Sequence, residues 1–459
     1  MLSFQTLKTK LFAPVDALTS SLFLRLFGFI IVVQAYSYAQ YDFIEQGILA
    51  PKFLFSFDGF SFIKPLPEGI MKGMLLLILI SGILLIVNKF IKFALASFLL
   101  CFSYFFLLDK SYYNNHFYLF ILLAFIFLFY KEKTDPSTQK KQIPYWFLLL
   151  LQIQIVIVYF YGGIAKLNTD WLLHQQPLQI LLDGTKQNAL LPDLNTSTFA
   201  LYLLTYGGLL FDLSIGFLLW AKKTRKLGVL LSLGFNLSNI VLFNFGDNGA
   251  IGGFPMFMIF SLLLFIDPAS VRSYLAQWGL NNKNPNSTTT ANKTATTSFD
   301  KQQNLILIGL GIYLSFQLLF PFRQFLYPGN TSWTARGSKF SWRMKAHTKI
   351  PDIRFFGRPS PKDSLREINV GKMINSMQRY QMGEDPVMIV QFAHFIGKEF
   401  KDNGASNPEV YAHARISLNG RPYFAIIDST RDLLKVEHHI FAADDWIRPL
   451  SPSELQQIK

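Results

Sequence analysis

Long apolar runs constrain this chain more than any other feature of its sequence. Two of them read MLLLILISGILLIV from Met74 and YWFLLLLQIQIVIVYFYGGIA from Tyr145. Runs of this kind are typical of membrane-spanning helices, which need about 20 mostly apolar residues. Only 16% of the residues are charged, against roughly 25% in an ordinary soluble protein. The sequence therefore excludes a purely soluble enzyme and a disordered scaffold.

The apolar runs predict a polytopic α-helical membrane protein with about nine transmembrane helices. These helices are expected at residues 21–39, 69–88, 90–108, 113–130, 144–165, 197–220, 227–245, 249–266 and 303–322. The transmembrane domain comprises residues 1–324, with a flexible cytoplasmic loop at 268–302. The centre of that loop, residues 281–297, is polar and of low complexity, as is typical of linkers.

Residues 325–459 have the composition of a soluble domain, which we expect to be an extracytoplasmic, β-rich α+β or β-sandwich-like domain. Alternation of apolar and polar residues predicts strands at 387–392 (VMIVQF) and 411–418 (YAHARISL). The turn at 418–421 (LNGR) is a hairpin signal. Residues 365–382 read better as a helix.

The distribution of basic residues predicts the orientation. If the N-terminus is cytoplasmic, the cytoplasmic loops carry more than twice as many Lys and Arg residues as the opposite loops. This bias follows the positive-inside rule and places the C-terminal domain outside the cytoplasm. The net charge of +14 is therefore a topology signal, and no motif for binding nucleic acid accompanies it.

Polar residues crowd the predicted outer ends of two helices. Asn115 and His116 begin the fourth predicted helix, and Lys166 ends the fifth. Asn115 and His116 are either helix caps at headgroup level or groups held at depth by a partner. Lys166 either extends its charge to the interface beside Trp171 or acts as a base whose amine is neutral in a dry site.

Other polar residues favour structural roles. Asp212 lies within the sixth predicted helix, well below Lys166 if both helices are straight, and we expect it to bond to the backbone or to Ser214. The glycine-rich stretch at 243–254 is either a connecting turn or part of a pocket wall. His438 and His439 have no further ligands at metal spacing and are read as surface residues.

Several motifs resemble the vitamin K-dependent gamma-glutamyl carboxylases and their bacterial relatives, which share the horizontally transferred transmembrane domain. The resemblance runs in order over most of the chain. It is carried by residues 109–119 (DKSYYNNHFYL), 154–171 (QIVIVYFYGGIAKLNTDW), 212–218 (DLSIGFL) and 325–344 (FLYPGNTSWTARGSKFSWRM).

The resemblance implies an enzyme of the inner (cytoplasmic) membrane that couples oxygenation of reduced vitamin K, a phylloquinol or menaquinol, to carboxylation of glutamate. O2 and CO2 are its co-substrates, and no metal is expected. Its partners would be the lipid bilayer and a glutamate-containing protein or peptide on the extracytoplasmic side, without nucleic acid. The implied catalytic residues are Lys166, which deprotonates the hydroquinone, and His116.

The resemblance also implies two further groups of residues. The quinone would be held by Asn115, His116, Tyr161, Asn236 and Asn239. The substrate side would include Arg323, Trp342 and Arg343, of which the last two fall in the motif that meets the membrane site from outside.

Two departures from the family pattern leave an alternative open. Asn236 and Gln324 stand where the family usually has histidines. Oxygenation of the quinol could survive these changes while carboxylation is lost. The competing hypothesis is a quinol-oxygenating relative, or a non-catalytic quinone- or lipid-binding module that presents its outer domain to a partner.

Overall fold

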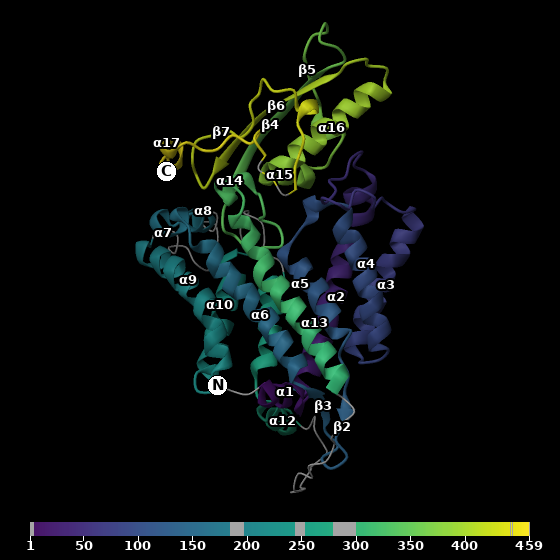
Figure 1. The fold of residues 1–459 in the computed structure, drawn as a ribbon, viewed down its shortest axis with the longest axis vertical. Coiled ribbons are helices and arrows are strands. Elements are labelled where there is room, and N and C mark those ends of the chain that lie inside the picture. The colour runs from purple at the N-terminus through teal and green to yellow at the C-terminus, as the bar shows by residue number, and fades with distance from the viewer. Residues whose placement is uncertain are drawn as a thin grey trace.

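The computed structural model describes residues 4–183, 197–243, 253–278, 300–440, 442 and 444–458. A helical bundle carries a smaller, sheet-containing C-terminal domain at one end, which Figure 1 shows at the top and which we call the upper end. The main helices of the bundle are α2 (Leu18–Gln40), α3 (Glu68–Ile86), α4 (Ile91–Leu108), α5 (Asn115–Phe127), α6 (Tyr145–Lys166), α9 (Thr198–Trp220), α10 (Arg225–Phe243), α11 (Phe254–Ser261) and α13 (Asp300–Leu319).

Six helical segments of the described residues are long and apolar enough to cross a membrane: α2, α3, α4, α6, α9 and the segment Lys301–Phe325 that begins in α13. This finding confirms a helical membrane protein but not the count of nine. The predicted helix at 113–130 is only the short α5. The one at 227–245 is α10, which starts with Arg225 and Lys226 and is not among the six.

The eighth of the nine predicted helices, at 249–266, is described from residue 253 onward and is followed by a sharp bend. It consists of α11 and a 3-10 turn (Leu262–Phe265), and the chain then turns by 105° into α12 (Pro268–Gln277). The expectation that residues 268–302 form a flexible loop throughout is therefore wrong for α12. The polar stretch at 281–297 lies outside the described residues.

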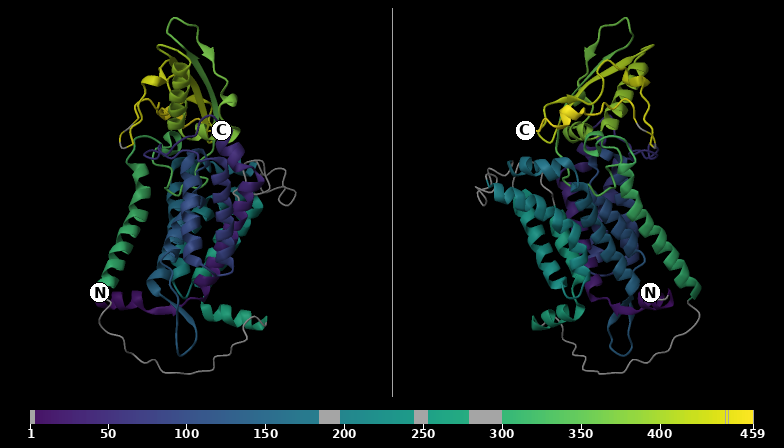
Figure 2. Two further views of the ribbon diagram at one scale, coloured as in Figure 1. Left: turned by 90° about the vertical axis from the view of Figure 1, so that its right-hand side faces the viewer. Right: turned by 60° about the vertical axis from the view of Figure 1, so that its left-hand side comes forward.

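The lower end of the bundle is covered by short elements that lie across it. Figure 2 shows α1 (Phe4–Phe12) and α12 roughly perpendicular to the long helices. A small sheet of order β1-β3-β2, built from β1 (Pro14–Asp16), β2 (Lys133–Thr134) and β3 (Lys141–Pro144), joins this region. Arg272 of α12 forms an ion pair with Asp16 of β1 at 2.7 Å, which fastens α12 to the bundle.

The C-terminal domain is built on a four-stranded antiparallel sheet of order β5-β4-β6-β7. The central pair, β4 (Lys349–Arg358) and β6 (Glu409–Leu418), is in register over ten residues, from Lys349 opposite Leu418 to Arg358 opposite Glu409. The edge strands are β5 (Arg366–Glu367) and β7 (Phe424–Ala425). Helices α15 (Ser376–Glu384) and α16 (Pro386–Asp402) pack on the sheet, and the short helices α14 (Thr331–Thr334) and α17 (Pro452–Leu455) complete the domain.

Two local predictions in this domain are wrong. Residues 387–392 lie in α16 and not in a strand, because Asp385 caps the helix by accepting from the Val387 amide at 3.1 Å and Pro386 occupies its first position. A continuous apolar run does not distinguish a buried strand from a buried helix. Of the helix predicted at 365–382, only the part from Ser376 is α-helical, and Asn375 begins it with a capping box, whereas Val370–Lys372 forms a 3-10 turn.

The strand at 411–418 and the hairpin turn after it are confirmed. Strand β6 pairs with β7 through Ile416 and Phe424. Asn419 and Gly420 both have a positive φ, of 52° and 78°, which is the backbone geometry that an Asn-Gly turn permits.

A buried polar cluster joins this hairpin to the bundle. Asp170, in α7 (Thr169–His174), accepts hydrogen bonds at 2.7 Å from Arg421 and from Asn419, and the Arg421 and Asp170 side chains are only 1% and 7% exposed. A bidentate pair of this kind is directional as well as strong. It therefore sets how the C-terminal domain sits on the upper end of the bundle.

Candidate functional site

A buried ion pair lies at the upper end of α6. Lys166, the last residue of that helix, places its ammonium group against the carboxylate of Asp212 in α9. The two side chains are only 12% and 6% exposed, and the Lys166 nitrogen lies 5.2 Å from the centre of the Trp171 ring. The expectation that Asp212 lies well below Lys166 and bonds to the backbone or to Ser214 is therefore wrong.

Two glycines allow this pair to form. Gly162 and Gly163 lie on the same face of α6 as Lys166, at helical spacings of four and three residues. A Cβ atom on Gly163 would lie 2.7 Å from the Leu213 side chain and 3.2 Å from the Cβ of Asp212. Only residues without a side chain let α9 come this close.

A displacement of α9 along α6 brings Asp212 to the level of Lys166. The first half of α9 packs beyond the end of α6, against α7. There the Trp171 indole donates to the Thr205 carbonyl at 3.1 Å, and Tyr206 donates to the Leu172 carbonyl at 2.6 Å. The short helix α8 (Leu178–Asp183) also contacts α9 in this region.

The Asn115 amide links the start of α5 to the C-terminal domain. Its oxygen accepts from the Tyr113 hydroxyl at 2.8 Å, and its nitrogen donates to the Arg343 carbonyl at 3.2 Å. The next residue, Met344, has its methyl group 3.5 Å from the point where a Cβ on Gly162 would lie, beside the Asp212 carboxylate. Two consecutive residues, Arg343 and Met344, therefore contact Asn115 and the surroundings of the ion pair, respectively.

The His116 ring lies among aromatic side chains. Its centre is 4.4 Å from that of Phe117, 5.7 Å from Phe120 and 6.0 Å from Phe254 of α11. Its ring nitrogens make no hydrogen bond or ion pair with any residue that the structure describes. The imidazole can therefore offer a donor or an acceptor to a ligand in an otherwise apolar setting.

The other three residues expected to hold the quinone are Tyr161, Asn236 and Asn239, and the first two form hydrogen bonds within the protein. The Tyr161 hydroxyl bonds to the Leu318 carbonyl and its ring packs on Phe322, so it ties α6 to α13. Asn236 donates to the Tyr159 hydroxyl at 3.0 Å and to the Ser232 carbonyl at 2.8 Å.

Asn239 is half-buried on α10 and has no polar contact within the described ranges. Of these three residues, only Asn236 connects to the face of α6 that carries Lys166. It does so through Tyr159, which precedes Lys166 by two helical turns.

The three residues expected on the substrate side are also held by the protein. Trp342 is buried and stacks on Tyr118 with ring centres 4.9 Å apart. The Arg343 guanidinium donates to Gln324 at 2.8 Å and to Ser332 at 2.7 Å, and burial lowers its pKa to about 10. Only Arg323 lines an open cavity, where its guanidinium lies 3.8 Å from the Phe320 ring.

Sequence reasoning missed Asp212 as the partner of Lys166. A signal for this pair was present, because each residue is an ionisable group in an apolar helix and each requires a partner. The Gly162–Gly163 doublet marks the place of close approach. Within the described part of the chain, no group of three or more His, Cys, Asp or Glu residues could hold a metal ion.

Comparison with known proteins assigns both parts of the chain. The family model of the HTTM domain matches residues 12–269, which is more than half of the chain. The model described as the vitamin K-dependent gamma-carboxylase lumenal domain matches residues 302–453. No solved structure matches the chain.

Proposed function

Because the chain belongs to the vitamin K-dependent gamma-carboxylase family, we propose that it is a membrane enzyme that couples oxygenation of reduced vitamin K to the carboxylation of glutamate. The substrate would be a glutamate-containing protein or peptide on the extracytoplasmic side. The observation that carries this proposal is the buried pair of Lys166 and Asp212 at the upper end of the bundle, next to Met344, whose neighbour Arg343 is held by Asn115.

The residues around this point suit a reduced quinone. Its fused ring is flat and apolar, and the aromatic side chains around His116 offer a matching surface. Its two hydroxyl groups need polar partners, and the uncommitted His116 ring and the Asn115 amide lie at the start of the same helix. We therefore place the quinone between α5 and α6, near the upper end of the bundle.

Reduced vitamin K, when bound, supplies the reducing power: with O2 it gives the epoxide and drives exchange of a glutamate γ-hydrogen for CO2, with water as the other product. The protein must begin this chemistry by accepting a proton from a quinol hydroxyl. Lys166 and Asp212 share one proton as a pair. Whichever residue holds that proton, the other can accept one more, so the pair can act as a general base.

Burial of the site strengthens the hydrogen bonds that the protein can donate to the quinol. Trp171 and the aromatic side chains near His116 keep water from the reacting groups, and in a dry site a fixed hydrogen-bond donor stabilises developing negative charge more than it would in water. His116 and Asn115 are the donors in question. Since Asn115 also holds the Arg343 carbonyl, its position depends on the docked C-terminal domain.

A specific observation supports a second candidate, quinol oxygenation without carboxylation. The sequence resemblance implies histidines at the positions where this chain has Asn236 and Gln324. Asn236 bonds to Tyr159 and Ser232, and Gln324 accepts from Arg343. Neither amide can transfer a proton as an imidazole can, so a step that requires those histidines would fail.

One assay separates these possibilities. The purified protein is incubated with reduced vitamin K, O2, bicarbonate and a glutamyl peptide, and the epoxide and the carboxylated peptide are measured separately. Both products are expected for a carboxylase. Epoxide alone would identify the oxygenating relative, and the absence of both products would contradict an enzymatic function.

A further inference from the structure

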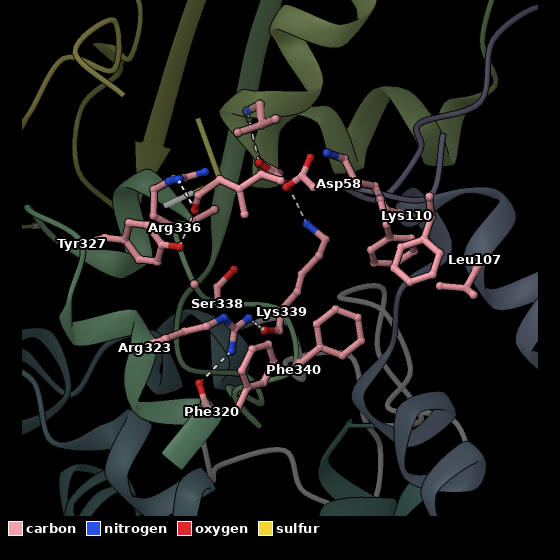
Figure 3. Close-up of a pocket in the computed structure, with 17 residues that line it drawn as sticks. Asp58, Leu107, Lys110, Phe320, Arg323, Tyr327, Arg336, Ser338, Lys339 and Phe340 are labelled. Atoms are coloured by element: carbon pink, nitrogen blue, oxygen red, sulfur yellow. Dashed lines mark hydrogen bonds and ion pairs between the residues drawn. The ribbon is translucent and has the colours of Figure 1, made fainter. Parts of the chain in front are cut away.

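A cavity of about 280 Å³ lies between the two domains, close to the candidate site but separate from it. Figure 3 shows its charged walls: Lys110, Arg323, Arg336 and Lys339 reach toward it from different elements. Its apolar walls come from Phe57, Phe60, Leu107, Phe320, Phe340, Val387 and Ile440. A cavity that combines several cations with apolar walls is suited to an anion that carries a hydrocarbon portion.

Most charges around this cavity are already paired. Lys339 lies 2.6 Å from Asp385, Arg336 lies 3.2 Å from Asp444, and His438 lies 3.3 Å from Asp58. These pairs account for both carboxylates in the wall. Positive charge is left over on Lys110 and Arg323, neither of which forms an ion pair with a described residue.

Lys110 is the more unusual of these two cations. It lies in the 3-10 turn Lys110–Tyr112 that joins α4 to α5, and it is only 4% exposed. Its ammonium group makes no hydrogen bond with any residue that the structure describes. Burial lowers the pKa of Lys110. The nearby carboxylates of Asp385, Asp58 and Asp109 partly offset this effect, whereas the neighbouring cation Lys339 adds to it. A buried ammonium group without a direct partner is costly, unless a ligand supplies the opposite charge.

The cavity is connected to the candidate site through its floor. The backbone amide of Phe340 donates to the Tyr113 hydroxyl at 2.6 Å, and the same hydroxyl donates to Asn115 at 2.8 Å. Lys110 lies on the connection between α4 and α5, and Asn115 is the first residue of α5. A ligand in the cavity would therefore be two hydrogen bonds away from Asn115.

We propose that this cavity is a carboxylate-binding site in which Lys110 is the principal cation, and that the carboxylate belongs to an acidic side chain of the peptide substrate. The assignment to a peptide rests on the proposed function, whereas the affinity for a carboxylate does not. Bicarbonate offers the same chemistry, so it is the alternative source. The apolar walls favour the side chain, because bicarbonate has no hydrocarbon portion to cover them.

The test measures binding to the full-length protein in detergent by titration calorimetry, without quinone. The probes are a synthetic glutamate-containing peptide, the same peptide with glutamine in place of glutamate, and sodium bicarbonate. Lys110→Met should weaken binding of the glutamyl peptide at least tenfold, and Lys110→Arg should retain it within about threefold. The matched control is Lys64→Met, which removes an exposed cation from the same end of the bundle and should change the affinity less than twofold.

A second variant keeps Lys110 in place. Ser338 lines the cavity, so Ser338→Asp would put a tethered carboxylate inside it and should abolish peptide binding. Equal affinity of Lys110→Met and the unsubstituted protein, or equal binding of the glutamine peptide, would overturn the proposal. Lys110-dependent binding of bicarbonate without the peptide would keep the carboxylate site and overturn its assignment to a peptide.

The outcome is independent of the catalytic assay. Since the titration contains no quinone, failure to form the epoxide would contradict the proposed function without changing this result. Lys110→Met breaks no ion pair of the described residues and removes a costly buried charge, so its melting temperature should be no lower than that of the unsubstituted protein. That measurement separates a lost ligand contact from a folding defect.

Discussion

Lys166 and Asp212 compensate each other's charge in a buried site, where either charge without a partner would be strongly destabilised. A single buried charge loses hydration that only a partner or a ligand can replace. The pair therefore keeps an amine and a carboxylate together in a site from which most water is excluded. This property is what a base in an apolar site requires.

Substitutions of Lys166 and Asp212 should show whether Lys166 acts as a general base or only anchors the helix at the membrane interface. Lys166→Arg keeps the charge, but arginine does not release its proton in a protein. We expect Lys166→Arg and Lys166→Ala to lower epoxide formation at least 100-fold, within the range of about 10²–10⁴ for loss of a general base. Asp212→Asn should cost less, about tenfold, because the amine remains. Initial rates of epoxide formation, with Lys64→Arg as the matched control, test this.

A loss of less than about threefold in Lys166→Arg would instead leave Lys166 as an interfacial anchor. A small exogenous amine should partly restore Lys166→Ala, because it can occupy the vacated space, but not Lys166→Arg. Membrane insertion and elution volume must be unchanged in each variant, since breaking a buried pair can cost about 3–5 kcal/mol of stability.

His438 is not the surface residue that its sequence context predicts. Its side chain is 14% exposed and bonds to Asp444 at 3.2 Å and to Asp58 at 3.3 Å. Burial lowers its pKa, but these hydrogen bonds and the attraction of the two carboxylates outweigh burial and raise the pKa to about 9. The protonated ring therefore links the C-terminal domain to the segment before α3.

This raised pKa predicts how stability depends on pH. The folded protein binds the His438 proton more tightly than the unfolded chain, so the contribution is complete below about pH 6.5 and is lost as the pH rises through about 9. We expect it to be roughly 1–2 kcal/mol after allowance for partial solvent screening. Melting temperatures of the unsubstituted protein and His438→Gln should converge between pH 6.5 and 9.5. Parallel curves over that range would contradict the prediction.

At the scale of helices, α2 and α3 cross closely because each contributes a glycine to the crossing. A Cβ atom on Gly82 would lie 2.7 Å from the Gly28 carbonyl and 2.8 Å from the Val32 side chain. A Cβ atom on Gly28 would lie 2.7 Å from the Gly82 carbonyl in return. Small residues at such a crossing let two membrane helices gain packing contacts along their backbones.

Gly82→Ala should therefore destabilise the protein by about 1–3 kcal/mol, the typical cost of overpacking. Gly73, on the same helix, has no atom within 4 Å of its added Cβ. Gly73→Ala is the matched control and should be neutral or stabilising, because alanine is the better helix former. Thermal unfolding in detergent measures both variants, and equal melting temperatures would refute a tight α2–α3 crossing.

At the scale of the whole molecule, the basic loops predict that the C-terminal domain lies outside the cytoplasm. A C-terminal reporter that fluoresces only in the cytoplasm should therefore stay dark. The same reporter fused after Gln277, at the end of α12 on the opposite side of the bundle, should be bright. A strong signal from the C-terminal fusion would reverse the orientation and place the candidate site at the cytoplasmic end.

The sequence by itself determined the membrane class, the family and the change to a sheet-containing C-terminal region. A continuous apolar run of about 20 residues satisfies its backbone polar groups in lipid by forming a helix, so the longest runs identify a helical membrane protein, although they do not fix the number of spans. The Asn-Gly turn after β6 was likewise predictable, because few residues adopt its backbone angles. Lys166, Asn115 and His116 stood out because polar groups are rare at such positions.

Only the tertiary structure decided which of these residues meet. The partner of Lys166 depends on how far α9 is displaced along α6, and that displacement is set by the packing of α9 on α7, far from Asp212 in sequence. The apolar run at 387–392 became helical through its cap at Asp385 and its place on the sheet. The cavity at Lys110 has walls from both domains, so it arises only when they dock. The level of Asp212 relative to Lys166, the displacement of α9 along α6 and the docking of the two domains each depend on several segments, so no single segment of the sequence encodes them.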